Sequence, residues 1–215
     1  MHKVVTVFAG MLVCASAACA GDGYTRQPSS GGLSAYVGGH AGISIANTEV
    51  GISGAPVSLD GIGSHGAIGG VHAGLDYTLP AGIFFGVYGF YDWQSTETSV
   101  KLGGFEASVG LGDSYGIGGR LGYDWGKAKA YGLVGWRHAD LEWSAPVPIT
   151  GVPTSLTGID LGAGMAIPLG QGFELGLEGV WTKFDGESIG SGPGAITLDT
   201  TQLSVMGRLS LRFGN

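Results

Sequence analysis

Residues 202–213 read QLSVMGRLSLRF, and apolar and polar side chains alternate along this stretch. One set of alternate positions holds Leu203, Val205, Gly207, Leu209, Leu211 and Phe213, and the other holds Gln202, Ser204, Met206, Arg208, Ser210 and Arg212. Successive side chains of a β-strand point to opposite faces, so this period of two predicts a strand with one apolar and one polar face.

The same period recurs through the rest of the chain. It is clear in residues 114–125 and 173–182 and less regular in 34–45, 67–79, 83–94, 129–137 and 158–168. Both faces of 129–137 are mixed, and we place Ala130, Val134 and Trp136 on its apolar face. Together with 202–213, these segments predict eight strands.

The connections between the predicted strands alternate between tight and long. Tight turns are expected at 79–82, 126–127 and 168–172, and long connections at 46–65, 95–112, 140–156 and 185–199. All eight prolines fall in the N-terminal segment, in a connection or at a strand end, where they remove no ladder hydrogen bond. This alternation is typical of an up-and-down antiparallel sheet with all its long connections on one side.

The composition excludes several classes of protein. Of 215 residues, 44 are glycine, only 13% are charged and 44% are hydrophobic, which argues against a disordered chain. The glycines follow no three-residue period, which excludes collagen. With 10 basic and 17 acidic residues, the chain has no basic footprint for nucleic acid.

The first twenty residues have the features of an export signal. Met1-His2-Lys3 is short and positive, residues 4–19 carry no charge, and Ala18-Cys19-Ala20 supplies a small-x-small cleavage pattern. We therefore expect a signal peptide at 1–20, a periplasmic linker at 21–32 and a barrel at 33–215. The alternatives are a membrane anchor, for which the run is short, and lipid attachment at Cys19, whose preceding residues lack the usual Leu. Cys14 and Cys19 are the only cysteines, so the mature chain is expected to contain none.

Period two alone does not distinguish a soluble barrel with an apolar interior from a membrane barrel with an apolar exterior. The apolar faces carry aromatic residues near both strand ends, with Tyr77, Trp125, Phe173 and Phe213 at the tight turns and Trp93, Trp136 and Trp181 at the long connections. Two aromatic belts are typical of outer-membrane barrels. A soluble carrier would also need more than the four lysines that follow the signal. The sequence therefore predicts an all-β protein, an eight-stranded antiparallel up-and-down transmembrane β-barrel.

The polar faces then line the interior of the barrel, where charges must be paired. We expect a structural network in the lumen, made of Asp76, Asp92, Arg120, Asp124, Glu174, Glu178, Arg208 and Arg212. Arg137 and Asp160 also fall on polar faces. No catalytic, cofactor-binding or metal-binding residue is assigned, and the protein is not expected to be an enzyme.

Four segments resemble one family. Residues 34–39 (SAYVGG), 69–77 (GGVHAGLDY), 157–165 (TGIDLGAGM) and 209–213 (LSLRF) are similar to strands of the opacity-type, OmpA-like outer-membrane β-barrels of Gram-negative bacteria, notably small surface proteins of alphaproteobacteria. The resemblance implies a monomer in the outer membrane, in contact with membrane lipid and lipopolysaccharide and inserted by the barrel-insertion machinery. The chain departs from the family pattern in ending on Gly214-Asn215 rather than on an aromatic residue.

The expected function is a structural and surface-interaction role, with host or ligand contact through the four long connections. These contain Glu49, Asp60, Glu97, Glu106, Asp140, Glu142, Asp185 and Glu187, which also fit a solvated acidic surface. A small porin is the alternative.

Two further hypotheses concern histidines. His40 and His72 are expected side by side in the lumen, as packed polar residues or as ligands of a metal or haemin. Arg137-His138-Ala139-Asp140 is similar to the histidine region of lipid A-modifying barrels, but Asp140 stands where such enzymes have their serine.

Overall fold

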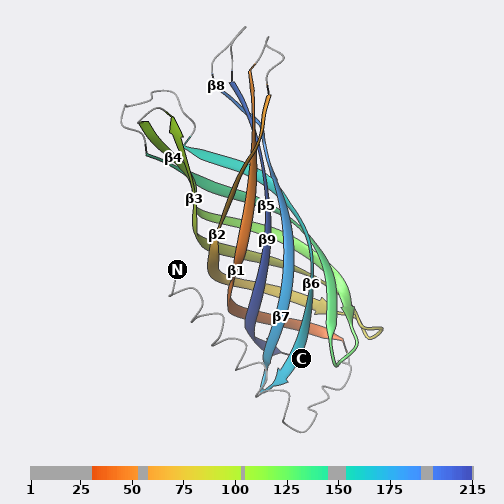
Figure 1. The fold of residues 1–215 in the computed structure, drawn as a ribbon. Helices are drawn as coiled ribbons and strands as arrows, with labels where there is room; N and C mark the ends of the chain where they lie inside the picture. Colours follow the sequence, from red (N-terminus) through yellow and green to blue (C-terminus); the bar gives the residue numbers. More distant parts are fainter. Residues whose placement is uncertain (1–30, 53–57, 103–104, 145–153, 190–195, 215) are drawn as a thin grey trace.

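The computed structural model describes residues 31–52, 58–102, 105–144, 154–189 and 196–214. They form a series of long antiparallel strands, which tilt around a common axis (Figure 1). The strands are β1 (Gly32–Ile52), β2 (Ser58–Thr78), β3 (Ile83–Leu102), β4 (Phe105–Asp124), β5 (Lys129–Ser144), β6 (Ser155–Gly170), β7 (Phe173–Phe184), β8 (Glu187–Ile189) and β9 (Ile196–Gly214).

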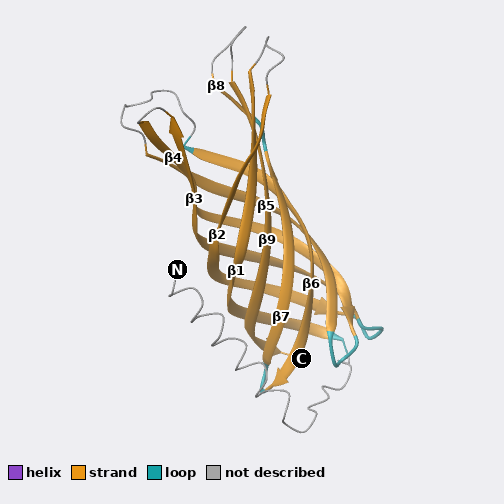
Figure 2. Cartoon of the chain, viewed as in Figure 1, coloured by secondary structure: helices purple, strands orange, loops and turns teal. Residues whose placement is uncertain are grey.

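The sheet closes on itself. Each strand from β1 to β7 pairs with its neighbour in sequence, β7 pairs with β9, and β9 pairs with β1 from Ser34↔Gly214 to Ile52↔Ile196. The three-residue β8 pairs only with β9, so the barrel itself has eight strands. The predicted fold class is confirmed. The described segments are strands and short loops (Figure 2), and they include no helix long and apolar enough to cross a membrane.

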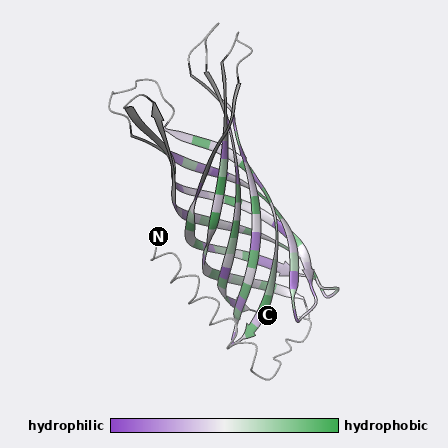
Figure 3. Ribbon diagram, viewed as in Figure 1, coloured by the Kyte–Doolittle hydropathy of each residue, from purple (hydrophilic) through white to green (hydrophobic). Residues whose placement is uncertain are grey.

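The side chains of the strands point to the faces that the alternating pattern predicts. Outward-pointing Ile117, Leu121 and Leu177 are each more than 60% exposed, whereas Asp76 and Asp92 are 1% exposed. Residues 129–137 also have the predicted register, since Val134 and Trp136 are exposed while Arg137 is buried. In Figure 3, hydrophobic and hydrophilic colours alternate along the strands.

The aromatic residues of both predicted belts lie on the outer face. Tyr77, Trp125, Phe173 and Phe213 are 42–56% exposed at the tight turns, and Trp93, Trp136 and Trp181 are 40–51% exposed at the opposite strand ends.

 These placements confirm that the apolar, aromatic-rimmed face of the sheet is the outer one.

Three tight turns lie at one end of the barrel, called here the turn end, together with Gly32 and Gly214. At the first, the Gly82 amide donates to Leu79 O at 2.9 Å, and Gly82 has a φ of 87°, which favours glycine. At the second, the Trp125 amide donates to Ala128 O at 2.9 Å. The predicted turns are confirmed.

At the opposite end, called the loop end, the strands run further than predicted. β1 and β2 pair as far as Gly51↔Ser58, and β3 and β4 as far as Leu102↔Phe105. The predicted long connections at 46–65 and 95–112 are therefore mostly paired strand, which projects beyond the barrel in Figure 1. The prediction was wrong because it required an apolar face, whereas backbone pairing continues here without one.

Candidate functional site: the polar interior of the barrel

A cluster of charged side chains fills the lumen near the turn end. Asp76 on β2 accepts hydrogen bonds from Arg120 on β4, with Nε to Oδ1 at 2.8 Å and Nη2 to Oδ2 at 2.5 Å. It also accepts from Arg212 on β9, with Nη2 to Oδ2 at 2.7 Å. One buried carboxylate thus joins three strands of the barrel.

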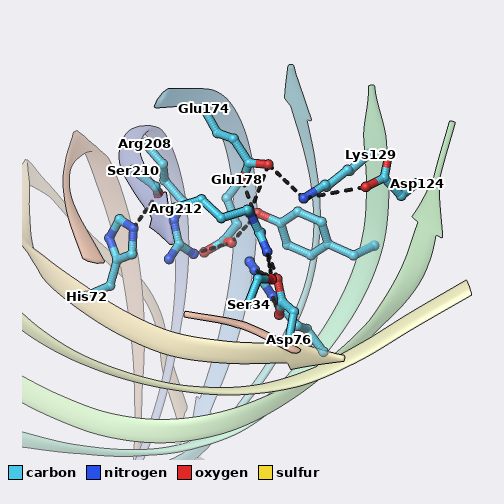
Figure 4. A network of polar contacts seen from close by, with 12 residues as sticks. Ser34, His72, Asp76, Asp124, Lys129, Glu174, Glu178, Arg208, Ser210 and Arg212 are labelled. Atoms are coloured by element: carbon cyan, nitrogen blue, oxygen red, sulfur yellow. Dashed lines mark hydrogen bonds and ion pairs between the residues drawn. The ribbon is translucent and has the colours of Figure 1, made fainter. Parts of the chain in front are cut away.

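Glu174 on β7 extends this cluster across the lumen (Figure 4). Its Oε1 lies 3.0 Å from Arg212 Nε and 2.6 Å from Lys129 Nζ on β5. Lys129 Nζ also lies 3.6 Å from Asp124 Oδ2 at the end of β4. Lys129 was missed by the sequence analysis because it begins a strand whose two faces are both mixed in composition.

A second group occupies the middle of the lumen. Glu178 on β7 pairs with Arg208 on β9 and accepts a hydrogen bond from Tyr131 Oη at 2.8 Å. Arg120 lies 5.1 Å from the centroid of the Tyr131 ring and 4.2 Å from that of Tyr36. The guanidinium therefore contacts both aromatic rings as well as its carboxylate.

A third group lies toward the loop end. Arg137 on β5 donates from Nη1 to Asp92 Oδ2 at 2.6 Å and from Nε to Asp160 Oδ1 at 3.1 Å. Thr182 Oγ1 donates to Asp160 Oδ1 at 2.7 Å. Arg137 and Asp160 were outside the assigned network, although the period of two places both on polar faces.

All eight residues assigned from the sequence point into the lumen, and each contacts an opposite charge or a histidine. They divide among the three groups: Asp76, Arg120, Asp124, Glu174 and Arg212 near the turn end, Glu178 and Arg208 in the middle, and Asp92 toward the loop end. Side chains fill the space between them. Among the described residues, one cavity of about 20 Å³ lies beside His40 and His72, and another of the same volume lies beside Ser210. That volume holds about one water molecule.

His40 and His72 are brought together as predicted. Their Nδ1 atoms lie 3.2 Å apart, His40 Nε2 lies 2.7 Å from Asp92 Oδ1, and His72 Nε2 lies 2.8 Å from Ser210 Oγ. Within the described part of the chain, no group of three or more His, Cys, Asp or Glu residues is arranged to hold a metal ion.

The residues around His138 point to different faces of the sheet. Arg137 points into the lumen, whereas His138 lies on the outside, with its ring centroid 5.2 Å from that of Tyr115. His138 Nε2 is 4.0 Å from Asp140 Oδ1. Ser114, which pairs in register with Ala139, is buried and receives a hydrogen bond from Arg137.

The acidic residues of the long connections are only partly described. Asp140 and Asp185 are exposed to solvent at the loop end. The side chains of Glu49, Asp60, Glu97, Glu106, Glu142 and Glu187 lie outside the described residues.

The closed barrel, its apolar exterior and its charged interior agree with the comparison with known protein families. The model of the outer membrane protein beta-barrel domain matches residues 6–213. The chain belongs to this family. It is therefore an outer-membrane protein, whose exposed leucine, isoleucine and aromatic side chains face lipid. No curated protein matches the chain in sequence.

Solved structures of other outer-membrane barrels match this chain at low sequence identity. The outer membrane protease OmpT of Escherichia coli is 8% identical, with a TM-score of 0.51 over 84% of this chain and 97% of OmpT. Neisserial surface protein A is 19% identical, with a TM-score of 0.39 over 82% of this chain and 97% of its own. Ail, the attachment invasion locus protein of Yersinia pestis, was solved with the heparin analogue sucrose octasulfate; it is 18% identical, with a TM-score of 0.35 over 79% of this chain and 98% of Ail.

Proposed function

We propose that this outer-membrane β-barrel is a closed structural anchor that presents its loop-end extensions at the cell surface, and that it does not conduct. The observation that carries the proposal is the filled lumen. Three ion-paired groups follow one another along the described barrel, and the two cavities beside the histidines and Ser210 each hold about one water. A permanent pore would need a continuous aqueous path past these groups.

The charges of the lumen have a stabilising role in this proposal, not a catalytic one. Each carboxylate of the network lies within 4.0 Å of a cationic side chain, with Asp76 and Glu174 each contacting two. Isolated buried charges are strongly unfavourable, so these pairs permit a polar interior without water. The proposal includes no catalytic residue and no cofactor.

In one of the segments that resemble the opacity-type, OmpA-like barrels, two glycines leave room for side chains of the lumen. Gly70, in the segment 69–77, lies so close to His40 and Asp92 that an added Cβ would be 2.7 Å from His40 Nε2 and 2.8 Å from Asp92 Oδ1. Gly74 leaves the corresponding space for the Tyr36 ring. In the proposed subfamily assignment, residues 1–20 are removed on export, residues 21–32 are a periplasmic linker and the turn end faces the periplasm.

The proposed partners follow from this orientation. Lipopolysaccharide and membrane lipid contact the outer face, the insertion machinery acts on the chain during assembly, and a host or other surface ligand contacts the loop end. The β1–β2 and β3–β4 extensions offer paired strands beyond the barrel for such a contact. The barrel is proposed to act as a monomer.

Conductance distinguishes the anchor from a small porin. The purified, refolded barrel is inserted into a planar lipid bilayer, with a known porin as the positive control and empty detergent as the negative control. We expect no stable unit conductance. Reproducible steps of one size, present at neutral pH, would refute the anchor and establish the porin.

The surface role is tested by shortening one extension. In the variant, residues 48–62 are replaced by a two-residue Asn-Gly turn, which retains the Ala46↔Ser64 pair. We expect unchanged heat-modifiable migration on SDS gels, showing that the barrel is folded, and reduced adhesion of expressing cells to host cells or matrix. Equal adhesion by wild-type and shortened proteins would contradict a role for this extension.

A further inference from the structure

Two imidazole rings face each other near the middle of the lumen. Their Nδ1 atoms are 3.2 Å apart, and the ring centroids are 5.5 Å apart with the planes inclined by 28°. The centroid separation is close to the value expected if both centroids and both Nδ1 atoms lay on one straight line. The two nitrogens therefore point directly at each other. This geometry suits a linear N–H···N hydrogen bond. It does not suit a metal ion between them, because half of 3.2 Å is shorter than a zinc–imidazole bond of about 2.0–2.1 Å.

The outer nitrogen of each ring limits where the protons lie. Asp92 Oδ2 accepts from Arg137, and Oδ1 lies 2.7 Å from His40 Nε2; a carboxylate only accepts, so His40 donates from Nε2. Ser210 Oγ, 2.8 Å from His72 Nε2, can either donate or accept. Three arrangements remain. In the first, Ser210 donates to His72 and His72 donates to His40, and both rings are neutral. In the other two the pair holds one more proton, and either His40 or His72 is an imidazolium that donates from both of its nitrogens.

The surrounding charges distinguish these arrangements. The titratable and charged groups that face the pair are Tyr36 on β1, Tyr88 and Asp92 on β3, Arg120 on β4, Arg137 on β5, Asp160 on β6, Glu178 on β7 and Arg208 on β9. The cavity beside the pair is lined by the three carboxylates and by only two of the three guanidinium groups, Arg137 and Arg208, because Arg120 pairs with Asp76.

The same surplus holds for the whole described lumen. Its carboxylates are Asp76, Asp92, Asp124, Asp160, Glu174 and Glu178, and its cations are Arg120, Lys129, Arg137, Arg208 and Arg212. One negative charge is therefore left without a balancing cation. A single proton on the histidine pair neutralises it, and burial strongly favours such neutralisation.

We propose that His40 and His72 form a shared-proton site, which holds one proton, completes the charge balance of the lumen and makes the barrel sensitive to acid. A second proton would put an N–H on both Nδ1 atoms, so neither could accept. It would also bring two imidazolium rings together beside Arg137 and Arg208. The inference concerns the stability of the barrel and does not depend on whether the protein is an anchor or a porin.

The sign of the acid effect follows from proton counting. In the unfolded chain, two histidines with ordinary pKa values of about 6.5 bind two protons in mild acid, whereas the folded pair binds one. The folded state thus loses stability as the pH falls below about 6.5. The unfolding equilibrium constant rises toward a limit of about tenfold for each pH unit.

Nitrogen NMR of the refolded barrel with ¹⁵N-labelled histidine tests the proton count directly. At pH 7 we expect three protonated ring nitrogens across the pair: both Nε2 atoms and one proton shared between the two Nδ1 atoms. Two protonated nitrogens would show a neutral pair and overturn the proposal. Addition of equimolar Zn²⁺ should leave both rings unchanged; a shift of both Nδ1 signals would identify a metal chelate and also overturn it.

Urea unfolding in lipid vesicles at pH 6.5 and pH 5 tests the acid effect. The wild-type protein is expected to show about an eightfold rise in the unfolding equilibrium constant over this range, because the pH dependence is zero at pH 6.5 and steepens only below it. His72→Gln should lose most of this rise. His138→Gln, which changes a histidine on the outer face, is the matched control and should behave as the wild type. Equal acid sensitivity in His72→Gln and the wild type would overturn the proposal.

Discussion

The ion pairs near the turn end predict a large effect for one small substitution, Asp76→Ala. Asp76 is 1% exposed and accepts three hydrogen bonds, two from Arg120 and one from Arg212. Arg212 retains Glu174 when Asp76 is removed. Among the described residues, Arg120 has no other carboxylate partner, so its guanidinium would remain buried between two tyrosine rings without a counterion.

Removing one partner of a buried ion pair costs about 3–5 kcal/mol of folding free energy. The unfolding equilibrium constant should therefore rise by about two to three and a half orders of magnitude. In the double variant Asp76→Ala/Arg120→Met, neither charge remains uncompensated, so we expect it to be more stable than Asp76→Ala alone. This comparison separates the loss of a charge partner from the loss of side-chain volume.

The assay is urea unfolding of the barrel in phospholipid vesicles, followed by tryptophan fluorescence. Asp140→Ala is the control, because its side chain is 63% exposed at the loop end and its removal should change stability by less than about 0.5 kcal/mol. The reasoning is refuted if Asp76→Ala lies within about 1 kcal/mol of the wild type. It is also refuted if the double variant is the less stable by the full sum of the two single effects.

Five other substitutions test the faces of the sheet and the packing of the lumen. Gly70→Val should prevent folding to the heat-modifiable form, because its Cβ would clash with His40, Asp92 and the Tyr91 carbonyl. In Gly179→Ala the added Cβ meets nothing within 4 Å, so this substitution should raise the folding stability by about 0.5–1 kcal/mol. Leu177→Arg places a charge on the lipid-facing side halfway along β7 and should lower the folding stability in vesicles by about 2–4 kcal/mol. The charge of Phe213→Arg, at the turn end, should lower it by only about 0–1 kcal/mol, and equal losses would contradict the membrane placement. Tyr131→Phe removes a hydrogen bond to Glu178 while Arg208 remains, so urea unfolding should show a loss of about 1–3 kcal/mol, and no loss would contradict a buried bond.

The sequence predicts the barrel more completely than it predicts the contacts inside. Alternation fixes the face of each residue, so Asp76, Arg120 and Arg212 could be placed in the lumen without a structure. Which acid meets which base depends on the stagger of the strands, which the alternation does not specify. Asp76 and Arg120, for example, lie on strands that are not neighbours, and their side chains meet across β3 at Gly86.

The loop end could not be predicted in the same way. Inside the membrane, lipid requires every outward side chain to be apolar, which produces the alternation. Beyond the membrane that requirement ends, so the paired segments up to Gly51↔Ser58 and Leu102↔Phe105 carry no such pattern. Lys129, at the other end of the barrel, was missed because the strand that it begins has two mixed faces.

The high glycine content follows from the width of the barrel. An eight-stranded barrel has room for interior side chains but not for a large residue at every inward position. Gly164 lies opposite Tyr131 in register, and a Cβ there would be 2.6 Å from the Tyr131 ring; Gly74 stands in the same relation to Tyr36. The two tyrosines lie on either side of Arg120, which pairs with Asp76. These glycines therefore support the ion pair indirectly: a larger residue at either position would displace the ring that covers the guanidinium.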